Sequence, residues 1–147
     1  MLINGVVTEA ANSTLSLFGT TAGNGGAASG VAMANSGGVR LNNGATLAVT
    51  GQAANTGTPT SAETAVNVSG SGIAYAAGAT ASGNITITGT STSASNSNAV
   101  YLGGGVYTNG GNITVSAQNP AGGSGYGVNV AGAVNASGNV TIQTPGS

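Results

Sequence analysis

The stretch GNITITGTSTSASNSNAVYLGGGVYTNG (83–110) runs directly into GNITVSAQNPAGGSGYGVNVAGAVNASG (111–138), and a third opening, GNVTIQ, begins at Gly138. The two units place apolar residues at the same intervals, with Gly and Asn between short alternating segments. Strict alternation between turn residues is typical of strands rather than helices. Self-similarity of this kind predicts a repeat protein in which each unit is one set of short strands.

Working outward from this pair, the whole chain fits a template of three short strands per unit, A, B and C. Each unit has five recurring apolar positions, here called columns: two in strand A, one in strand B and two in strand C. Disorder is disfavoured, because a disordered low-complexity chain would not confine its apolar residues to such columns. Strand A is expected at Met1/Ile3, Val31/Met33, Val66/Val68, Val100/Leu102 and Val128/Val130. Strand B is expected to begin at Val7, Val39, Ile73, Val106 and Val134, and strand C at Leu15/Leu17, Leu47/Val49, Ile85/Ile87, Ile113/Val115 and Val140/Ile142.

Three strands repeating along the chain predict an all-β fold, a parallel β-solenoid (β-helix) of about five three-strand coils. One coil cannot bury its own apolar face, whereas stacked coils form a continuous core. We expect right-handed winding, because parallel β crossovers are almost always right-handed. We expect one domain over 1–147, with coils starting near 1, 31, 66, 100 and 128. The longer polar loops follow strand C and should share one edge; they are 18–30, 50–65, 88–99 and 116–127.

The composition excludes most chemistry. The chain has no His, Cys, Lys or Asp, and its charged side chains are Glu9, Arg40 and Glu63. Neither a catalytic triad nor a Schiff base nor a zinc site can form from this set, and two carboxylates far apart in the sequence make a poor calcium site. We therefore expect no enzyme, no catalytic, cofactor-binding or metal-binding residues and no cofactor.

The same inventory restricts the partners. One Arg cannot neutralise a phosphate backbone, so we expect no nucleic acid. No stretch approaches 18 consecutive apolar residues, so we expect no membrane insertion. Residues 1–30 lack the basic and apolar regions of a signal peptide, so an export signal would lie outside this chain.

The units, with strands A, B and C at the positions given above, resemble the repeats of filamentous haemagglutinin-type exoproteins, the large adhesins of two-partner secretion. The resemblance is carried by the G-N-[IV]-T-[IV] starts at 83–87, 111–115 and 138–142, and by the strand pairs at 99–106 and 127–134. It implies a right-handed β-helical shaft, export to the cell surface or the medium, and a role in attachment or biofilm.

Two surface patterns predict binding alternatives. On strand C the outward positions form two columns rich in Thr, which resemble the ice-binding face of antifreeze solenoids. These columns are Ser16, Ala48, Thr86, Thr114, Thr141 and Phe18, Thr50, Thr88, Ser116, Gln143. By alternation Tyr101 and Tyr107 point outward, where they could stack on the sugar rings of a polysaccharide.

Six N-x-S/T sequons allow a second interpretation of the Asn residues, namely glycosylation. The structural interpretation is favoured, because Asn84, Asn112 and Asn139 occupy one place in successive coils and could hydrogen-bond along the stack. The remaining sequons begin at Asn12, Asn67 and Asn135. Glu9 and Arg40 fall one coil apart on strand B, and a bridge between them would contribute about 0–1 kcal/mol.

The sequence thus predicts a non-enzymatic structural segment, the shaft of an extracellular bacterial adhesin or fibre. Both ends are expected to be open, because the first and last coils carry the same apolar columns as the middle ones. The expected partners are further coils or identical subunits, stacked end to end. The alternatives are a surface-binding solenoid, for polysaccharide or ice, and a self-assembling matrix protein.

Overall fold

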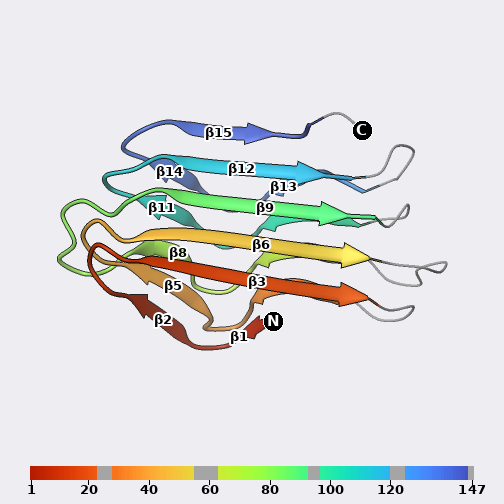
Figure 1. Cartoon of the computed structure of the whole chain (residues 1–147), viewed down its shortest axis with the longest axis horizontal. Coiled ribbons are helices and arrows are strands. Elements are labelled where there is room, and N and C mark those ends of the chain that lie inside the picture. The colour runs from red at the N-terminus through yellow and green to blue at the C-terminus, as the bar shows by residue number, and fades with distance from the viewer. Residues whose placement is uncertain (23–27, 55–62, 93–96, 120–124, 146–147) are drawn as a thin grey trace.

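The computed structural model describes residues 1–22, 28–54, 63–92, 97–119 and 125–145. These residues form strands and no helix, arranged as three parallel five-stranded sheets that wind into a β-solenoid (Figure 1). Each coil contributes one strand to each sheet, so the predicted fold class is confirmed; the right-handed winding stays a prediction.

The three sheets repeat in the order A, B, C along the chain. Sheet A contains β1 (Leu2–Ile3), β4 (Ser29–Met33), β7 (Thr64–Val68), β10 (Asn98–Leu102) and β13 (Val128–Val130). Sheet B contains β2 (Val6–Glu9), β5 (Gly38–Leu41), β8 (Gly72–Tyr75), β11 (Val106–Thr108) and β14 (Val134–Ala136). Sheet C contains β3 (Thr14–Ala22), β6 (Thr46–Ala54), β9 (Ile85–Ser91), β12 (Ile113–Gln118) and β15 (Val140–Gln143).

The register stacks the predicted apolar columns directly on one another. In sheet A, Val31 pairs with Val66 and Val66 with Val100. In sheet C, Leu47 pairs with Ile85 and Ile85 with Ile113. These side chains are fully or almost fully buried and form one continuous core. Because the side-chain period of a strand is two, a slip of one residue would turn each column outward, so the apolar pattern fixes the register.

Sheet C is longer than the sequence suggested. The sequence marked only two apolar positions in each strand C, such as Leu15 and Leu17, but β3 and β6 both have nine residues. The extra length lies in stretches that were assigned to loops, where the inward residues are Gly, Ala, Ser and Thr instead of Val, Ile and Leu. At the Gly positions any side chain would collide with sheet A: a Cβ on Gly51 would overlap the carbonyl oxygen of Ala65, and one on Gly89 that of Ala99.

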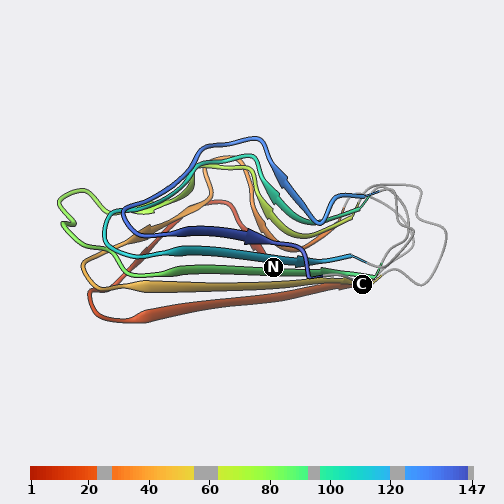
Figure 2. The same cartoon turned by 90° about the horizontal axis from the view of Figure 1, so that it is seen from above.

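The cross-section is therefore a wedge. Figure 2 shows sheet C as a flat base and sheets A and B as a bent upper wall, with sheet A converging on sheet C toward one edge. Large residues such as Met33 and Leu41 fill the wide part, and Ala53 and Ala117 fill the narrow part. Small residues give no hydrophobic periodicity, which explains why the ends of these strands could not be recognised from the sequence.

A charge placed in one column tests this arrangement. Val115 is fully buried, while its neighbour Thr114 faces outward from the same strand. We expect Val115→Asp to lower the free energy of unfolding by about 3–5 kcal/mol, because it leaves an unpaired charge in the core. Thr114→Asp should change it by less than about 0.5 kcal/mol. Denaturation followed by far-UV circular dichroism measures both, and equal losses would contradict the assigned register.

Candidate interaction surfaces

Both end coils expose some column residues that the middle coils bury, although Ile3 and Leu17 of the first coil stay buried (6% and 5% exposed). Val39, Ile73 and Val106 in sheet B are 0% exposed, whereas Val7 at the start of the same column is 36% exposed. At the other end, Val140 and Ile142 of β15 are 43% and 45% exposed, against 0% for Ile113 and Val115 beneath them. Each end face of the described solenoid thus carries exposed apolar residues beside strand edges, the kind of template on which further strands add.

A ladder of side-chain amides runs along the stack beside sheet C. The Asn84 Oδ1 accepts a hydrogen bond from the backbone N–H of Asn112 (2.9 Å), and the Asn112 Oδ1 accepts one from that of Asn139 (2.8 Å). The structural interpretation of these three Asn residues is confirmed, while glycosylation stays untested. Asn139 repeats the position of Asn112 in the last coil, so its Oδ1 is placed to receive an N–H from a coil stacked on β15.

The opposite end face carries a carboxylate. Glu9 pairs with Leu41 in the inward column of sheet B, and its side chain accepts a hydrogen bond from the Ser13 hydroxyl. An inward-pointing charge at a sheet edge is a known device against indiscriminate pairing. The two end faces therefore differ, since one is apolar throughout its columns and the other contains a half-buried Glu9.

Glu9 and Arg40 do not form the ion pair that the sequence suggested. Register pairs Arg40 with Thr8, and its guanidinium donates to backbone carbonyl oxygens, those of Val39 (3.0 Å), Gly72 and Ser71 (both 3.5 Å). Strand alternation explains the difference, because Glu9 lies in an inward column and Arg40 in an outward one. The bridge that the sequence left conditional is therefore not formed.

The outer face of sheet C carries the two expected columns. Thr86, Thr114 and Thr141 stack in register, as do Thr50, Thr88 and Ser116. On β3 the exposed ring of Phe18 (61%) interrupts the face, and Gln143 interrupts it on β15. Hydroxyl groups near one edge bond to each other across coils, with 2.7 Å between the Oγ1 atoms of Thr14 and Thr46. The face is flat in Figure 2, but its regular Thr array spans only the central coils.

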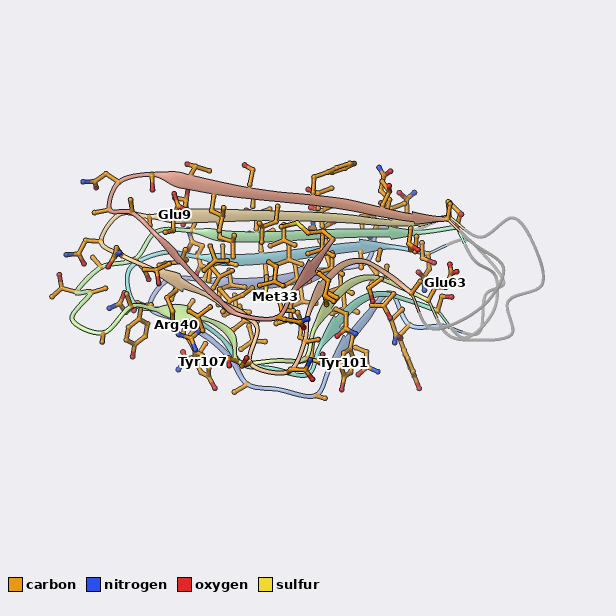
Figure 3. The ribbon with its side chains drawn as sticks, turned by 90° about the horizontal axis from the view of Figure 1, so that it is seen from below. Glu9, Met33, Arg40, Glu63, Tyr101 and Tyr107 are labelled. Atoms are coloured by element: carbon orange, nitrogen blue, oxygen red, sulfur yellow. The ribbon has the colours of Figure 1, made fainter. Side chains whose placement is uncertain are left out.

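Tyr101 and Tyr107 lie on either side of the corner between sheets A and B (Figure 3). Their rings lie over glycine: a Cβ on Gly103 would stand 2.6 Å from a ring carbon of Tyr101, and one on Gly105 would overlap the ring of Tyr107. The triple glycine at this corner thus lets both rings lie against the backbone. Both side chains are only partly exposed, while Tyr75 is 45% exposed.

Tyr75 and Tyr107 border a groove of about 320 Å³ on sheet B. The other lining residues are Thr108, Asn109, Asn135, Ala136 and Ser137. Asn109 serves the fold, because its amide accepts from the backbone N–H of Ser82 (2.7 Å) and donates to the carbonyl of Ala79 (2.6 Å). Asn135 stacks on Tyr107 and is exposed, so two rings, an amide and the Ser137 hydroxyl face the solvent together. Sequence reasoning found Tyr107 but not this groove, because Tyr75 reaches it from the previous coil.

The comparisons with known proteins leave the family open. No family model matches the chain, and neither a curated protein nor a solved structure matches it. Within the described ranges no helix has the length and apolarity to cross a membrane. The same ranges hold no cluster of three or more His, Cys, Asp or Glu side chains that could bind a metal ion.

The amide ladder generates a testable expectation. Asn112→Ala removes the acceptor for the Asn139 N–H at a solvent-exposed position, so the loss should be about 0.5–1.5 kcal/mol in the free energy of unfolding. Asn135→Ala serves as the matched control, because Asn135 is also an exposed Asn of an N-x-S/T sequon. Chemical denaturation of both variants measures the difference in their free energies of unfolding. An Asn112→Ala variant as stable as the Asn135→Ala control would show that the amide ladder does not stabilise the fold.

Proposed function

We propose that this chain is a non-enzymatic structural segment, the shaft of an extracellular adhesin or fibre, and that it stacks end to end. The observation that carries the proposal is the exposure of Val7 at one end and of Val140 and Ile142 at the other, in columns that are buried in between. A solenoid that stops in solution normally has a polar cap on each end. Stacking removes this apolar area from water and pairs the edge N–H and C=O groups.

The extracellular setting rests on the resemblance of the repeats to filamentous haemagglutinin-type exoproteins. A shaft needs little chemistry of its own, which is consistent with a chain in which only 2% of the residues are charged. The near absence of charge also means that little electrostatic repulsion opposes the approach of a second copy. The proposed partners are further coils of the same kind or identical subunits.

Head-to-tail stacking has a distinctive signature in mixtures of blocked variants. We expect the wild-type chain to form fibres at high concentration with a meridional repeat of about 4.8 Å. Val7→Lys should block one end face and Ile142→Lys the other, since both side chains are already partly exposed and a Lys can reach solvent. Each variant alone should form no fibre, and an equimolar mixture should form a heterodimer through the two intact faces.

Thr141→Lys is the matched control, because Thr141 lies on the same strand as Ile142 but faces outward. This variant should assemble like the wild type. Light scattering with size-exclusion chromatography measures the masses, and fibre diffraction measures the repeat. A wild-type chain that stays monomeric at high concentration, or end-face variants that assemble as the control does, would contradict the stacking proposal.

The groove on sheet B favours a second candidate function, the binding of a neutral polysaccharide. Aromatic rings offer flat apolar surfaces, and the Asn135 amide and the Ser137 hydroxyl could hydrogen-bond to sugar hydroxyl groups. No acidic or basic side chain lines this groove, which disfavours strongly charged ligands. An ice-binding function receives less support, because Phe18 and Gln143 break the hydroxyl array.

Glycan-array binding distinguishes this candidate from a purely structural shaft. If the groove binds sugar, Tyr107→Ala should lower the affinity about tenfold or more, because the main stacking surface is lost. Tyr126→Ala provides the control, since Tyr126 is 66% exposed and does not line the groove. Equal binding by both variants, or no binding of the wild type to any glycan, would exclude the groove as a sugar site.

A further inference from the structure

The narrow edge of the wedge contains the one fully buried charged side chain of the described residues. Glu63 is 1% exposed, and its Oε2 accepts no hydrogen bond from any described residue. An unpaired buried carboxylate is costly, so such groups are normally paired with a cation or neutralised. The chain contains a single Lys or Arg, Arg40, and Figure 3 shows it at the opposite end of the cross-section from Glu63. The protein itself therefore supplies no cationic side chain for this carboxylate.

Register and hydrogen bonding place three further polar residues at the same edge as Glu63, in two adjacent layers. In sheet A, Ser97 stacks directly on Glu63, because the N–H of Asn98 bonds to the Glu63 carbonyl (3.1 Å). In sheet C, Asn119 follows Gln118, which pairs with Thr90, so register places Asn119 beside Ser91. The Asn119 Nδ2 crosses from sheet C to sheet A and donates to the carbonyl oxygen of Ser97 (3.3 Å). Glu63, Ser91, Ser97 and Asn119 thus form one cluster, here named the edge cluster.

Two buried oxygen atoms of the edge cluster lack a hydrogen-bond donor among the described residues. Beside the Glu63 Oε2, the Oδ1 of Asn119 is buried and accepts no hydrogen bond from a described residue. Ser91 and Ser97 are 2% and 0% exposed, and each has an interaction partner. A hydroxyl that donates a hydrogen bond still keeps lone pairs on its oxygen. Two buried acceptor oxygens in adjacent layers of this edge thus have no donor among the described residues.

We propose that the edge cluster binds a calcium ion, with the Glu63 carboxylate and the Asn119 Oδ1 as ligands and the two serines as supporting oxygens. Carboxylate, amide and hydroxyl oxygens are the ligands that this hard cation takes, in flexible geometry. A single carboxylate implies weak binding, with a dissociation constant of about 10⁻⁴ to 10⁻³ M. This site depends on one carboxylate and neutral oxygens, so the spacing of the two Glu residues in the sequence does not indicate it.

Bound calcium would join the layers where the core is thinnest. Glu63 belongs to the coil of β7 and Asn119 to the coil of β12, so one ion would link two successive coils at the edge where small residues such as Ala53 and Ala117 fill the apolar interior. A ligand that binds the folded state alone stabilises it in proportion to its saturation. The site is independent of the end faces, so its test does not depend on the stacking proposal.

Thermal denaturation with added CaCl2 tests the proposal, with isothermal titration calorimetry as the direct measure. The wild-type chain, first treated with a chelator, should show a rise of several degrees in Tm that saturates at millimolar calcium. Glu63→Gln should lose this rise and the binding heat while keeping the fold, because the amide has the same shape without the charge. Asn119→Ala should retain a weaker response, with the saturating concentration shifted upward at least threefold.

Glu9→Gln is the matched control, because Glu9 is the only other acidic side chain and lies at the far end of the cross-section (Figure 3). It should respond to calcium like the wild type. NaCl at equal ionic strength should produce no comparable rise in Tm. The proposal is overturned by a wild-type Tm that ignores calcium, by an equal response in Glu63→Gln, or by an equal response to NaCl.

Discussion

In-register stacking of one coil on the next is the constraint on which every other feature depends. A coil of three short strands encloses no interior of its own, so its apolar side chains are buried only when further coils stack on it. The backbone hydrogen bonds point along the stack and hold Val66 between Val31 and Val100. The same repetition aligns the Asn84–Asn112–Asn139 ladder, the Thr face of sheet C and the edge cluster, because identical positions in successive coils meet.

The fold could be predicted from the sequence wherever large apolar residues mark the columns. Pairs such as Ile85/Ile87 and Ile113/Val115 repeat at matching places, and the structure stacks them as expected. The ends of the sheet C strands could not be found, because Gly51, Gly89 and Ala53 carry no hydrophobic signal. Their requirement for small side chains arises from the closeness of sheet A, which is a tertiary contact that local patterning does not contain.

The candidate surfaces, too, could be predicted from the sequence only in part. Alternation placed Tyr107 on the outside, and the shared position of the Asn residues predicted their ladder. The groove needed Tyr75 from a different coil, and the edge cluster needed Glu63 and Asn119 from different sheets, so neither could be seen in any single repeat. Glu9 and Arg40 lie on adjacent strands but form no bridge, because the Glu9 side chain points inward and the Arg40 side chain outward.

The direction of the hydrogen bonds also determines how this solenoid would respond to tension. Because the bonds between coils run along the stacking axis, a pull on the two end coils loads the successive coil-to-coil interfaces in series, and the outermost coil would detach first. Each peeled coil would release its strands and its loop as slack before the next coil bears the load. A solenoid of this kind acts as an extensible tether that dissipates work coil by coil, and any link between two coils at the narrow edge would raise the force needed for one step.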